Sequence, residues 1–391
     1  MNNDHDEIRN PWSRRQFLQR GGMFAAGTTF ALSAAGLLTA CGSDTQSSAA
    51  TTATTAAGST PAGSTIAGTS SGATTGTAAG TAAAGDLATV KFQLGWLKLA
   101  QFGGHFVALS KGYFKDEGID AQFIAGGSGI NPLSLVESGQ VMMADANGSD
   151  ILTAVSKNIP LQCFGTIYQS TPNALMSLGT DPLMTLADLK GKTVGLPTGE
   201  QQLLTAMLKQ AGVDPTTVNM VSVGSDPSVL TSGQIQGYIG YGTQQGLSLQ
   251  KSGVDVKIVY FDQLGDPDYG NAFFATTDTL KDKADLVTRW LKADLRGWQD
   301  YVADPEAAAK LTWDLYNTET QAVLVNEQES AKAAVPLITG GGAAAHGLLW
   351  VEEDAFKQVY DLYKAAGTIT GDVDLSKVYT QQFLLAAGAK P

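Results

Sequence analysis

The sequence predicts a two-lobed α/β fold with a hinge and a ligand cleft between the lobes. Short runs rich in β-branched and aromatic residues alternate with segments of helical periodicity. This alternation occurs in two successive rounds, and the chain then becomes mostly helical from residue 281 onward. The chain has 391 residues, and the part after residue 86 is long enough to form two lobes with ordinary hydrophobic cores.

The first forty residues have the pattern of an export signal. A twin-arginine motif, SRRQFL from Ser13, precedes an apolar run from Met23 to Leu38, and Thr39 and Ala40 then lead to Cys41. This combination resembles a bacterial lipoprotein signal that is exported by the twin-arginine route, which implies that Cys41 becomes lipidated. The apolar run is short and rich in Ala, Gly and Thr, so it favours a removable signal over a membrane-spanning helix.

Residues 41–86 are predicted to form a tether behind the lipidated Cys41. They are almost entirely Ala, Thr, Gly and Ser, a composition that cannot bury a core. A flexible chain of about 45 residues has a root-mean-square reach of roughly 35–40 Å. We therefore expect the tether to let the folded region range over the outer surface of the bacterial cell membrane.

The charge and the scarcity of cysteine exclude several classes of protein. The formal net charge of −12 argues against binding to nucleic acid and against broad adhesion to anionic lipid, so we expect the acylated end to hold the protein at the membrane. We also expect a monomer. With Cys41 lipidated, only Cys163 remains, in an apolar stretch where it reads as a buried small hydrophobe. The three histidines, His5, His105 and His346, form no metal-binding pattern. We expect no metal, no cofactor and no catalytic residue.

The first round of alternation begins after the tether. Strands are predicted at residues 90–96, 120–124, 141–144 and 161–168, with helices at 103–117, 131–138 and 149–157.

The second round predicts the other sheet. A short helix at 186–192 leads to a strand at 193–196 and a helix at 201–211, which Gly212 ends, and strands follow near 219–223, 237–240 and 254–260. The helical tail is predicted at 285–303, 305–315, 318–334 and 351–366, and we expect it to pack on the first lobe. Crossings are expected near 173–178 and 271–276, so residues 87–175 and 275–391 are assigned to lobe 1 and 176–274 to lobe 2.

Four segments resemble the solute-binding proteins of the thiamine-pyrimidine-precursor, riboflavin, nitrate and sulfonate or taurine group. They are Gly95-Trp96 followed by GHFVA and KGYFKDEG, AGGSGINP from Ala125, DLKGKTVG from Asp188, and GYIGYGTQ from Gly237. The resemblance runs from about Val90 to Ala303 and implies the type II periplasmic-binding-protein fold. It also implies the extracytoplasmic substrate-binding component of an ABC importer, which captures a small molecule by lobe closure and delivers it to a permease and ATPase.

Ligands of such folds lie beyond the carboxyl ends of the strands, and the candidate site follows from that placement. Trp96 ends the first predicted strand and offers an aromatic plane for stacking. Glu200 is explained equally well by the preference for acids in the first turn of a helix, so we rank it below Tyr241 and Thr243, and we treat His105 as structural. The candidate ligand-binding residues are Trp96, Phe102, Gly127, Ser128, Asn131, Asp145, Asn147, Tyr168, Gln169, Tyr241, Thr243, Asp262, Tyr269 and Asn271.

The ligand and the class of function remain open at this point. In the thiamine-precursor branch a histidine commonly stands near Phe102, and the aromatic residue here favours a riboflavin-like ring over a simple pyrimidine precursor. A small sulfonate, taurine or nitrate is the alternative ligand class, although the acidic composition disfavours anions. The other classes are a ligand-sensing lipoprotein and an enzyme similar to the fungal pyrimidine synthase, whose histidine and cysteine-rich motif is not found here.

Overall fold

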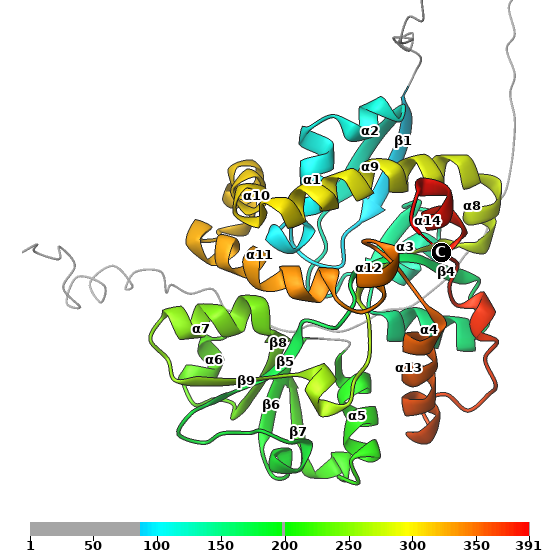
Figure 1. The fold of residues 1–391 in the computed structure, drawn as a ribbon. Helices are drawn as coiled ribbons and strands as arrows, with labels where there is room; N and C mark the ends of the chain where they lie inside the picture. The colour runs from blue at the N-terminus through cyan, green and yellow to red at the C-terminus, as the bar shows by residue number, and fades with distance from the viewer. Residues whose placement is uncertain (1–86, 198–199, 391) are drawn as a thin grey trace, which may run out of the picture. The chain divides into compact units, whose positions relative to one another are not determined.

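A computed structural model describes residues 87–197 and 200–390, and it contains two five-stranded sheets, one in each lobe (Figure 1). The predicted α/β class is therefore confirmed. Both lobes belong to the same compact unit of the chain. The predicted signal at residues 1–40 and the predicted tether at 41–86 lie outside the described residues.

The sheet of lobe 1 has the strand order β2-β1-β3-β10-β4. β1 pairs in parallel with β2 and β3, whereas β10 runs antiparallel between β3 and β4. Val90, Phe92 and Leu94 alternate toward the core at positions two residues apart, as a strand requires. The strands are β1 (Ala88–Gln93), β2 (Ile119–Ile124), β3 (Met143–Ala146), β4 (Leu161–Tyr168) and β10 (Gly270–Thr276).

The sheet of lobe 2 has the order β7-β6-β8-β5-β9. β6 pairs in parallel with β7 and β8, and β5 runs antiparallel between β8 and β9. Each sheet therefore receives one antiparallel strand from the chain that has just arrived from the other lobe. The strands are β5 (Asn173–Leu178), β6 (Thr193–Leu196), β7 (Asn219–Ser222), β8 (Gly237–Tyr241) and β9 (Val256–Tyr260).

The two crossings between the lobes come earlier in the chain than the predicted ones. The predicted lobe boundaries, at 175/176 and 274/275, fall inside β5 and inside β10. The full length of β5 is hydrogen-bonded into the second sheet, and β10 is paired with β3 and β4 of the first. The chain therefore crosses in the segments 169–172 and 261–269, because local periodicity does not reveal which sheet a strand joins.

Two predicted helices have different bounds in the structure, for local reasons. The predicted helix 103–117 is divided into α1 (Gly103–Ser110) and α2 (Tyr113–Asp116), because Gly112 adopts a left-handed conformation with φ +77°. The predicted helix 318–334 begins later, because α10 (Pro305–Thr320) continues to a left-handed Gln321 (φ +56°) and α11 (Leu324–Thr339) starts beyond it.

The remaining helices lie close to their predicted positions where predictions were made. The predicted helix at 201–211 is α5, and Gly212 follows its end with φ +72°, as the glycine stop requires. The other helices are α3 (Pro132–Glu137), α4 (Gly148–Ser156), α6 (Ser228–Thr231), α7 (Leu247–Lys251), α8 (Thr277–Asp282), α9 (Ala284–Ala303), α12 (Gly341–His346), α13 (Glu353–Ala365) and α14 (Gln382–Ala387).

The core of lobe 1 is built from aromatic rings. Phe92 stacks on Trp290 of α9 at 5.1 Å between ring centroids, and Phe273 of β10 meets Phe92 edge-on at 5.6 Å. His105 lies in this core, where its Nδ1 is 2.6 Å from the buried Asp294 carboxylate. Cys163 is fully buried and free, so its prediction as a core residue is confirmed.

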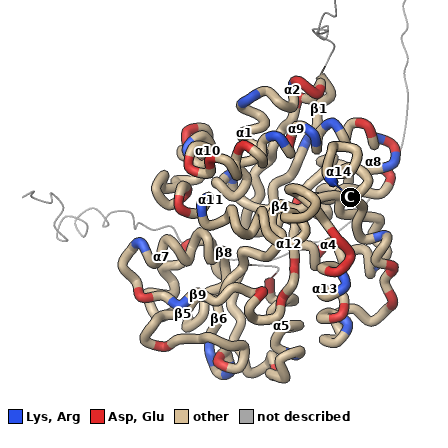
Figure 2. Tube along the Cα trace, viewed as in Figure 1, with Lys and Arg blue, Asp and Glu red and all other residues tan. Residues whose placement is uncertain are grey.

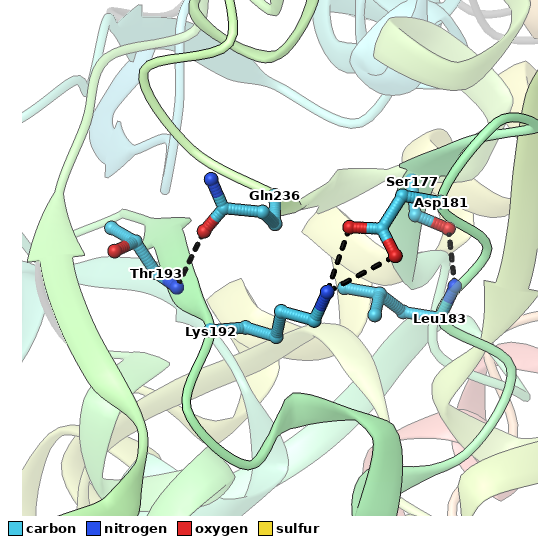
Figure 3. Close-up of polar contacts among 6 residues, drawn as sticks. All are labelled: Ser177, Asp181, Leu183, Lys192, Thr193 and Gln236. Carbon is cyan, nitrogen blue, oxygen red and sulfur yellow. Dashed lines mark hydrogen bonds and ion pairs between the residues drawn. The ribbon is translucent and has the colours of Figure 1, made fainter.

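Lobe 2 has a largely aliphatic core and a polar loop at its edge. Met176, Leu230 and Leu249 are among its buried residues. After β5, Lys192 Nζ donates to both carboxylate oxygens of Asp181, at 2.8 and 3.0 Å, and the Leu183 N–H donates to Ser177 Oγ at 2.9 Å (Figure 3). These contacts hold the loop that leads into β6.

The helical tail contacts both lobes, whereas the sequence predicted packing on lobe 1 alone. α9 packs along α1, and α14 packs on α9 and β4. α13 packs against α4 of lobe 1 and α5 of lobe 2, where Lys209 Nζ donates to the Ala366 carbonyl at 2.8 Å. α11 reaches α7, with Lys251 and Glu329 3.5 Å apart. Among the described helices none is both long and apolar enough to cross a membrane.

Candidate ligand-binding cleft

A cavity of about 510 Å³ lies between the lobes. From lobe 1 it is lined by the segments that follow β1, β2 and β3 and by α3 and α4; from lobe 2, by residues near the ends of β6 and β8 and at the start of α5. This is the position expected for a ligand in an α/β fold, because the carboxyl ends of parallel strands leave loops and helix starts facing the same crevice.

The cavity brings together eight of the fourteen predicted residues. Gly127, with φ +149°, lies in the loop after β2, where the sequence predicted a close approach to ligand. Whether these residues contact a ligand stays a prediction. The eight are Trp96, Gly127, Ser128, Asn131, Asp145, Asn147, Tyr241 and Asn271.

Three predicted residues are buried beside the cavity instead of lining it. Phe102 belongs to the short helix Ala100–Phe102, which turns its ring into the core of lobe 1 against His105. Thr243 is buried in the turn after β8, and Tyr168 meets the Tyr241 ring edge-on at 6.1 Å. Tyr168 is therefore placed to support Tyr241 from behind.

Three more predicted residues hold the hinge and the tail. Gln169 Nε2 donates to the Trp350 carbonyl at 2.9 Å, and its Oε1 accepts from the Ala343 N–H at 3.1 Å. Asp262 accepts from Ser170 Oγ at 3.1 Å, which joins the two crossing segments. Tyr269 is buried, and its hydroxyl accepts from the Glu352 N–H at 3.1 Å.

A chain of hydrogen bonds built on Asp145 connects the lobes. Asp145 Oδ1 accepts from the Gly95 N–H at 2.9 Å, and Oδ2 accepts from Asn271 Nδ2 at 2.5 Å. Asn271 Oδ1 in turn accepts from the Tyr241 hydroxyl of lobe 2 at 2.9 Å. Burial raises the pKa of Asp145 to about 6, while the two donors partly offset that rise. At neutral pH the ionised carboxylate therefore orients Asn271 toward Tyr241.

Glu200, which was ranked below Tyr241 and Thr243 as a candidate, lines the cavity, whereas Thr243 does not. It starts α5, and its Oε1 accepts from Asn147 Nδ2 across the cleft at 3.0 Å. Its Oε2 is shielded from solvent and has no hydrogen-bond partner among the described residues. Burial raises the pKa of Glu200, whereas Asn147 and Asn173 lower it. An unpaired buried acceptor is costly, so a ligand N–H or O–H at this oxygen would be strongly favoured.

A third contact between the lobes joins two glutamines. Gln244 Nε2 of lobe 2 donates to Gln101 Oε1 of lobe 1 at 2.8 Å, and both residues line the cavity. With Asn147–Glu200 and Tyr241–Asn271, the lobes meet at three side-chain hydrogen bonds around the cavity. Each is modest in net energy, so together they can stabilise a closed arrangement without making it permanent.

The cavity is acidic. Four carboxylates line it, from Glu137, Asp145, Asp150 and Glu200, and the only cationic side chain among the lining residues is that of Lys157. Elsewhere in the described chain, lysines, arginines and acids alternate along turns and helix surfaces (Figure 2). The lining contains neither histidine nor cysteine, and no cluster of metal-binding side chains occurs in the described residues. The described lining therefore offers carboxyl groups, other hydrogen-bonding side chains and aromatic faces.

Two curated relatives are named as binding proteins. The riboflavin-binding protein RibY of Chloroflexus aurantiacus is 24% identical over 304 residues, which cover 76% of this chain and 86% of that protein. The formylaminopyrimidine-binding protein of Halalkalibacterium halodurans is 27% identical over 229 residues, 57% of this chain and 69% of that protein.

Other similarities extend to an enzyme and to a solved structure. The 4-amino-5-hydroxymethyl-2-methylpyrimidine phosphate synthase of Legionella pneumophila is 23% identical over 301 residues, 75% of this chain and 92% of that protein. The alkanesulfonate-binding protein SsuA from Xanthomonas axonopodis pv. citri, solved with MOPS, superposes with a TM-score of 0.58 at 13% identity and covers 76% of this chain and 99% of its own. That likeness confirms the predicted type II periplasmic-binding-protein fold.

The family model that matches the chain is described as NMT1/THI5 like and spans residues 100–308, more than half of the sequence. The match begins just after Trp96, includes both sheets' central strands and ends at the start of α10. The group that the sequence motifs indicated is thereby confirmed. This chain belongs to the NMT1/THI5-like family.

Proposed function

We propose that this chain is the extracytoplasmic solute-binding component of an ABC importer and that it captures a small aromatic heterocycle by closing its two lobes. The observation that carries the proposal is the cleft itself: Trp96 and Tyr241 line it from opposite lobes, beside the unpaired Glu200 Oε2. Aromatic faces suit a planar ring, and a lone carboxylate oxygen suits a ring N–H or a ligand hydroxyl.

The names of the binding-protein relatives support a riboflavin-like or pyrimidine-like ring as the ligand. A small sulfonate, taurine or nitrate is the second candidate, and the sulfonate-binding neighbour supports the fold that such proteins share. The charge of the cavity favours the ring. Burial raises the pKa of Asp150 to about 8 and leaves it largely neutral at pH 7. An anion would still face the carboxyl groups of Glu137, Asp145 and Glu200, with Lys157 as the single cation among the lining residues.

We propose a role in binding, without catalysis, although a pyrimidine phosphate synthase is among the relatives. The lining residues include no histidine or cysteine that could serve as a nucleophile or a general base. A ligand-sensing lipoprotein is the other candidate role. Genes for a permease and an ATPase beside this one would favour import, and a neighbouring receptor gene would favour sensing.

We also propose that residues 1–40 direct export by the twin-arginine route and that Cys41 carries the lipid anchor, with 41–86 as the tether. Replacing Arg14 and Arg15 by lysine should leave the protein unexported. Cys41→Ser should release an exported protein from the membrane fraction. A Cys41→Ser variant that stays with the membrane would contradict the lipid anchor.

The test of function is ligand binding by the purified full chain. Native mass spectrometry and thermal-shift assays would compare riboflavin, thiamine, its pyrimidine precursor, taurine and nitrate. A bound ligand at 100 times its Kd stabilises the folded state by about 2.7 kcal/mol, so a specific ring should raise the Tm in a concentration-dependent way. A response to taurine or nitrate alone would overturn the aromatic assignment.

Glu200→Gln supplies the matched variant for that assay. It keeps the size of the side chain but removes the carboxylate that lacks a partner, so ring binding should weaken about tenfold, the equivalent of roughly one net hydrogen bond to a charged group. Glu319→Gln, an exposed exchange outside the cavity lining, should leave affinity unchanged. Equal affinities in both variants would remove Glu200 from the site.

A further inference from the structure

The cavity extends beyond the meeting point of the lobes, into lobe 1 between α3 and α4. α4 and its C-cap line it with Asp150, Thr153, Ala154 and Lys157. These positions are spaced i, i+3, i+4 and i+7, so they form one continuous face of the helix. Leu133, Ser134 and Glu137 line it from one side of α3. Two helix faces thus border one groove that opens from the interlobe cleft.

The groove is long enough for an extended chain. Seven residues separate Asp150 from Lys157, and at 1.5 Å per residue the α4 face is about 10 Å long. Its lining includes the apolar side chains of Leu133, Ala154 and Ile159 and the hydroxyl groups of Ser134 and Thr153. Such a surface suits an alkyl chain whose substituents form hydrogen bonds.

We propose that this groove is a second subsite, which binds a neutral, hydroxylated alkyl chain carried by the ring in the interlobe cleft. The proposal rests on the proposed function and deepens it by naming the ligand class, a planar heterocycle with a polyol-like substituent. A single-ring pyrimidine would leave the groove empty. The Ser134 and Thr153 hydroxyls and the carboxylates can each hydrogen-bond to ligand hydroxyls.

The charges in the groove offer no net attraction to a phosphorylated chain. Burial, with Glu200 and Asp268 nearby, raises the pKa of Asp150 to about 8, so its carboxyl group is largely neutral at pH 7. A phosphate here would meet one carboxylate, from the exposed Glu137, and the flexible, exposed Lys157, and these two charges offset each other. A phosphate would therefore lose hydration without gaining a net opposite charge, whereas a free hydroxyl group keeps its hydrogen-bond partners.

The experiment compares three compounds that share one ring system: riboflavin, lumiflavin, in which a methyl group replaces the ribityl chain, and riboflavin 5′-phosphate. Isothermal titration of the purified full chain should give a Kd for riboflavin about tenfold or more below that for lumiflavin, as expected for one or two net hydrogen bonds. The phosphate should bind more weakly than riboflavin.

A pair of serine variants locates the effect. Ser134→Phe fills the groove from an exposed position, so it should erase the preference for riboflavin over lumiflavin and leave lumiflavin binding intact. Ser138→Phe, an equally exposed exchange at the end of α3 outside the lining, should leave the preference unchanged.

The outcomes separate the two proposals. Equal riboflavin and lumiflavin affinities, or a preference that survives Ser134→Phe, would overturn the subsite while the ring-binding function stands. Binding of the pyrimidine precursor with no flavin binding would also overturn the subsite alone. Binding of none of these rings would overturn the proposed function and the subsite with it.

Discussion

The two lobes share one strand arrangement but have different interiors. In both, three parallel strands are followed by an antiparallel strand that arrives from the other lobe, β10 in lobe 1 and β5 in lobe 2. Lobe 1 fills its core with stacked rings around Phe92 and Trp290, whereas lobe 2 relies on aliphatic side chains such as Met176 and Leu230. The two lobes therefore share a strand order because the chain enters each sheet in the same way. Their cores can still be filled by different kinds of side chain.

The site reflects this difference. Lobe 1 contributes Trp96, the loop after β2 that contains Gly127, Asp145 and the groove between α3 and α4. Lobe 2 contributes Tyr241 and Glu200. The aromatic core and the helices α9 and α14 support lobe 1 from behind. We infer that lobe 1 is the platform and that lobe 2 is the part that moves over the ligand, about the crossings at 169–172 and 261–269.

The largest expected effect tests the two cores. Trp290→Ala removes a fully buried ring and should lower the free energy of unfolding by about 3–5 kcal/mol. Leu230→Ala in α6 of lobe 2 removes a smaller buried side chain and should cost less, about 2–3 kcal/mol. Chemical denaturation of both variants measures the difference. A greater loss from Leu230→Ala would contradict the expectation that the aromatic core of lobe 1 contributes more to stability than the aliphatic core of lobe 2.

A pH dependence distinguishes a buried acid of lobe 1 from an exposed acid of lobe 2. Burial raises the pKa of Asp145 to about 6, so the native state holds this proton more tightly than the unfolded chain, and the contribution to stability is lost as pH rises from about 4 to about 6. The full contribution is at most about 3 kcal/mol. Hydrogen bonds from the Met184 and Thr185 N–H groups lower the pKa of Asp188, so its contribution has the opposite sign and is lost as pH falls.

Denaturation curves from about pH 2 to about pH 7.5 check this pair of signs, because the contribution of Asp188 is lost only below its ordinary pKa of about 4. Asp145→Asn should flatten the decline of stability with rising pH, although it also removes one of two acceptors for Gly95 and Asn271. Asp188→Asn should reduce stability at neutral pH and have little effect at the acid end. If stability depended on pH in the same way in both variants, the buried environment of Asp145 and the hydrogen-bonded environment of Asp188 would not have the opposite effects expected.

Trp96 is the aromatic residue that lobe 1 contributes to the cavity, and its effect on the binding free energy should be smaller than the stability effects above. Trp96→Ala should weaken binding of the ring by about 1–2 kcal/mol, roughly tenfold in Kd, with little change in unfolding, because Trp96 is only partly buried. Trp313→Ala, an equal truncation outside the cavity lining, should leave Kd unchanged. Unchanged affinity in Trp96→Ala would remove Trp96 from the site.

The smallest expected effect concerns the contact that joins the lobes. Tyr241→Phe removes the donor to Asn271 Oδ1 and should cost about 1 kcal/mol, which shifts the free protein toward an open arrangement. Small-angle X-ray scattering should then give a larger radius of gyration. Tyr238→Phe removes a comparable bond to the Gly224 carbonyl inside lobe 2 and should leave that radius unchanged. If both variants had the same radius of gyration, the hydrogen bond of Tyr241 would not be what holds the two lobes together in the free protein.

Most helices and strands could be predicted from the sequence, but not all of the segments that they contact in the fold. Strand β4 has its predicted bounds, and Gly212 stops α5, because hydrophobic runs and glycine stops are local signals. Gln169 and Tyr269, which were predicted to bind ligand, do not line the cavity and bond to Trp350 and Glu352 instead. The sequence does not show these contacts, because the path of the helical tail is not a local property.

The same limit applies within the cleft. Trp96 and Asp145 follow strands and were found by that rule, whereas the short helix at Ala100–Phe102 turns Phe102 away from the cavity. Glu200 was ranked low because an acid at a helix start has an ordinary explanation, and only its position against Asn147 and its unpaired oxygen distinguish it.

The position of β10 between β3 and β4 has a consequence for how the protein is made. β1 to β4 are synthesised first, but β10, which separates β3 from β4, follows only after the whole of lobe 2. Lobe 2 is one uninterrupted stretch of chain and can finish folding while lobe 1 still lacks one of its interior strands. The half that starts first on the ribosome is therefore the half that is completed last.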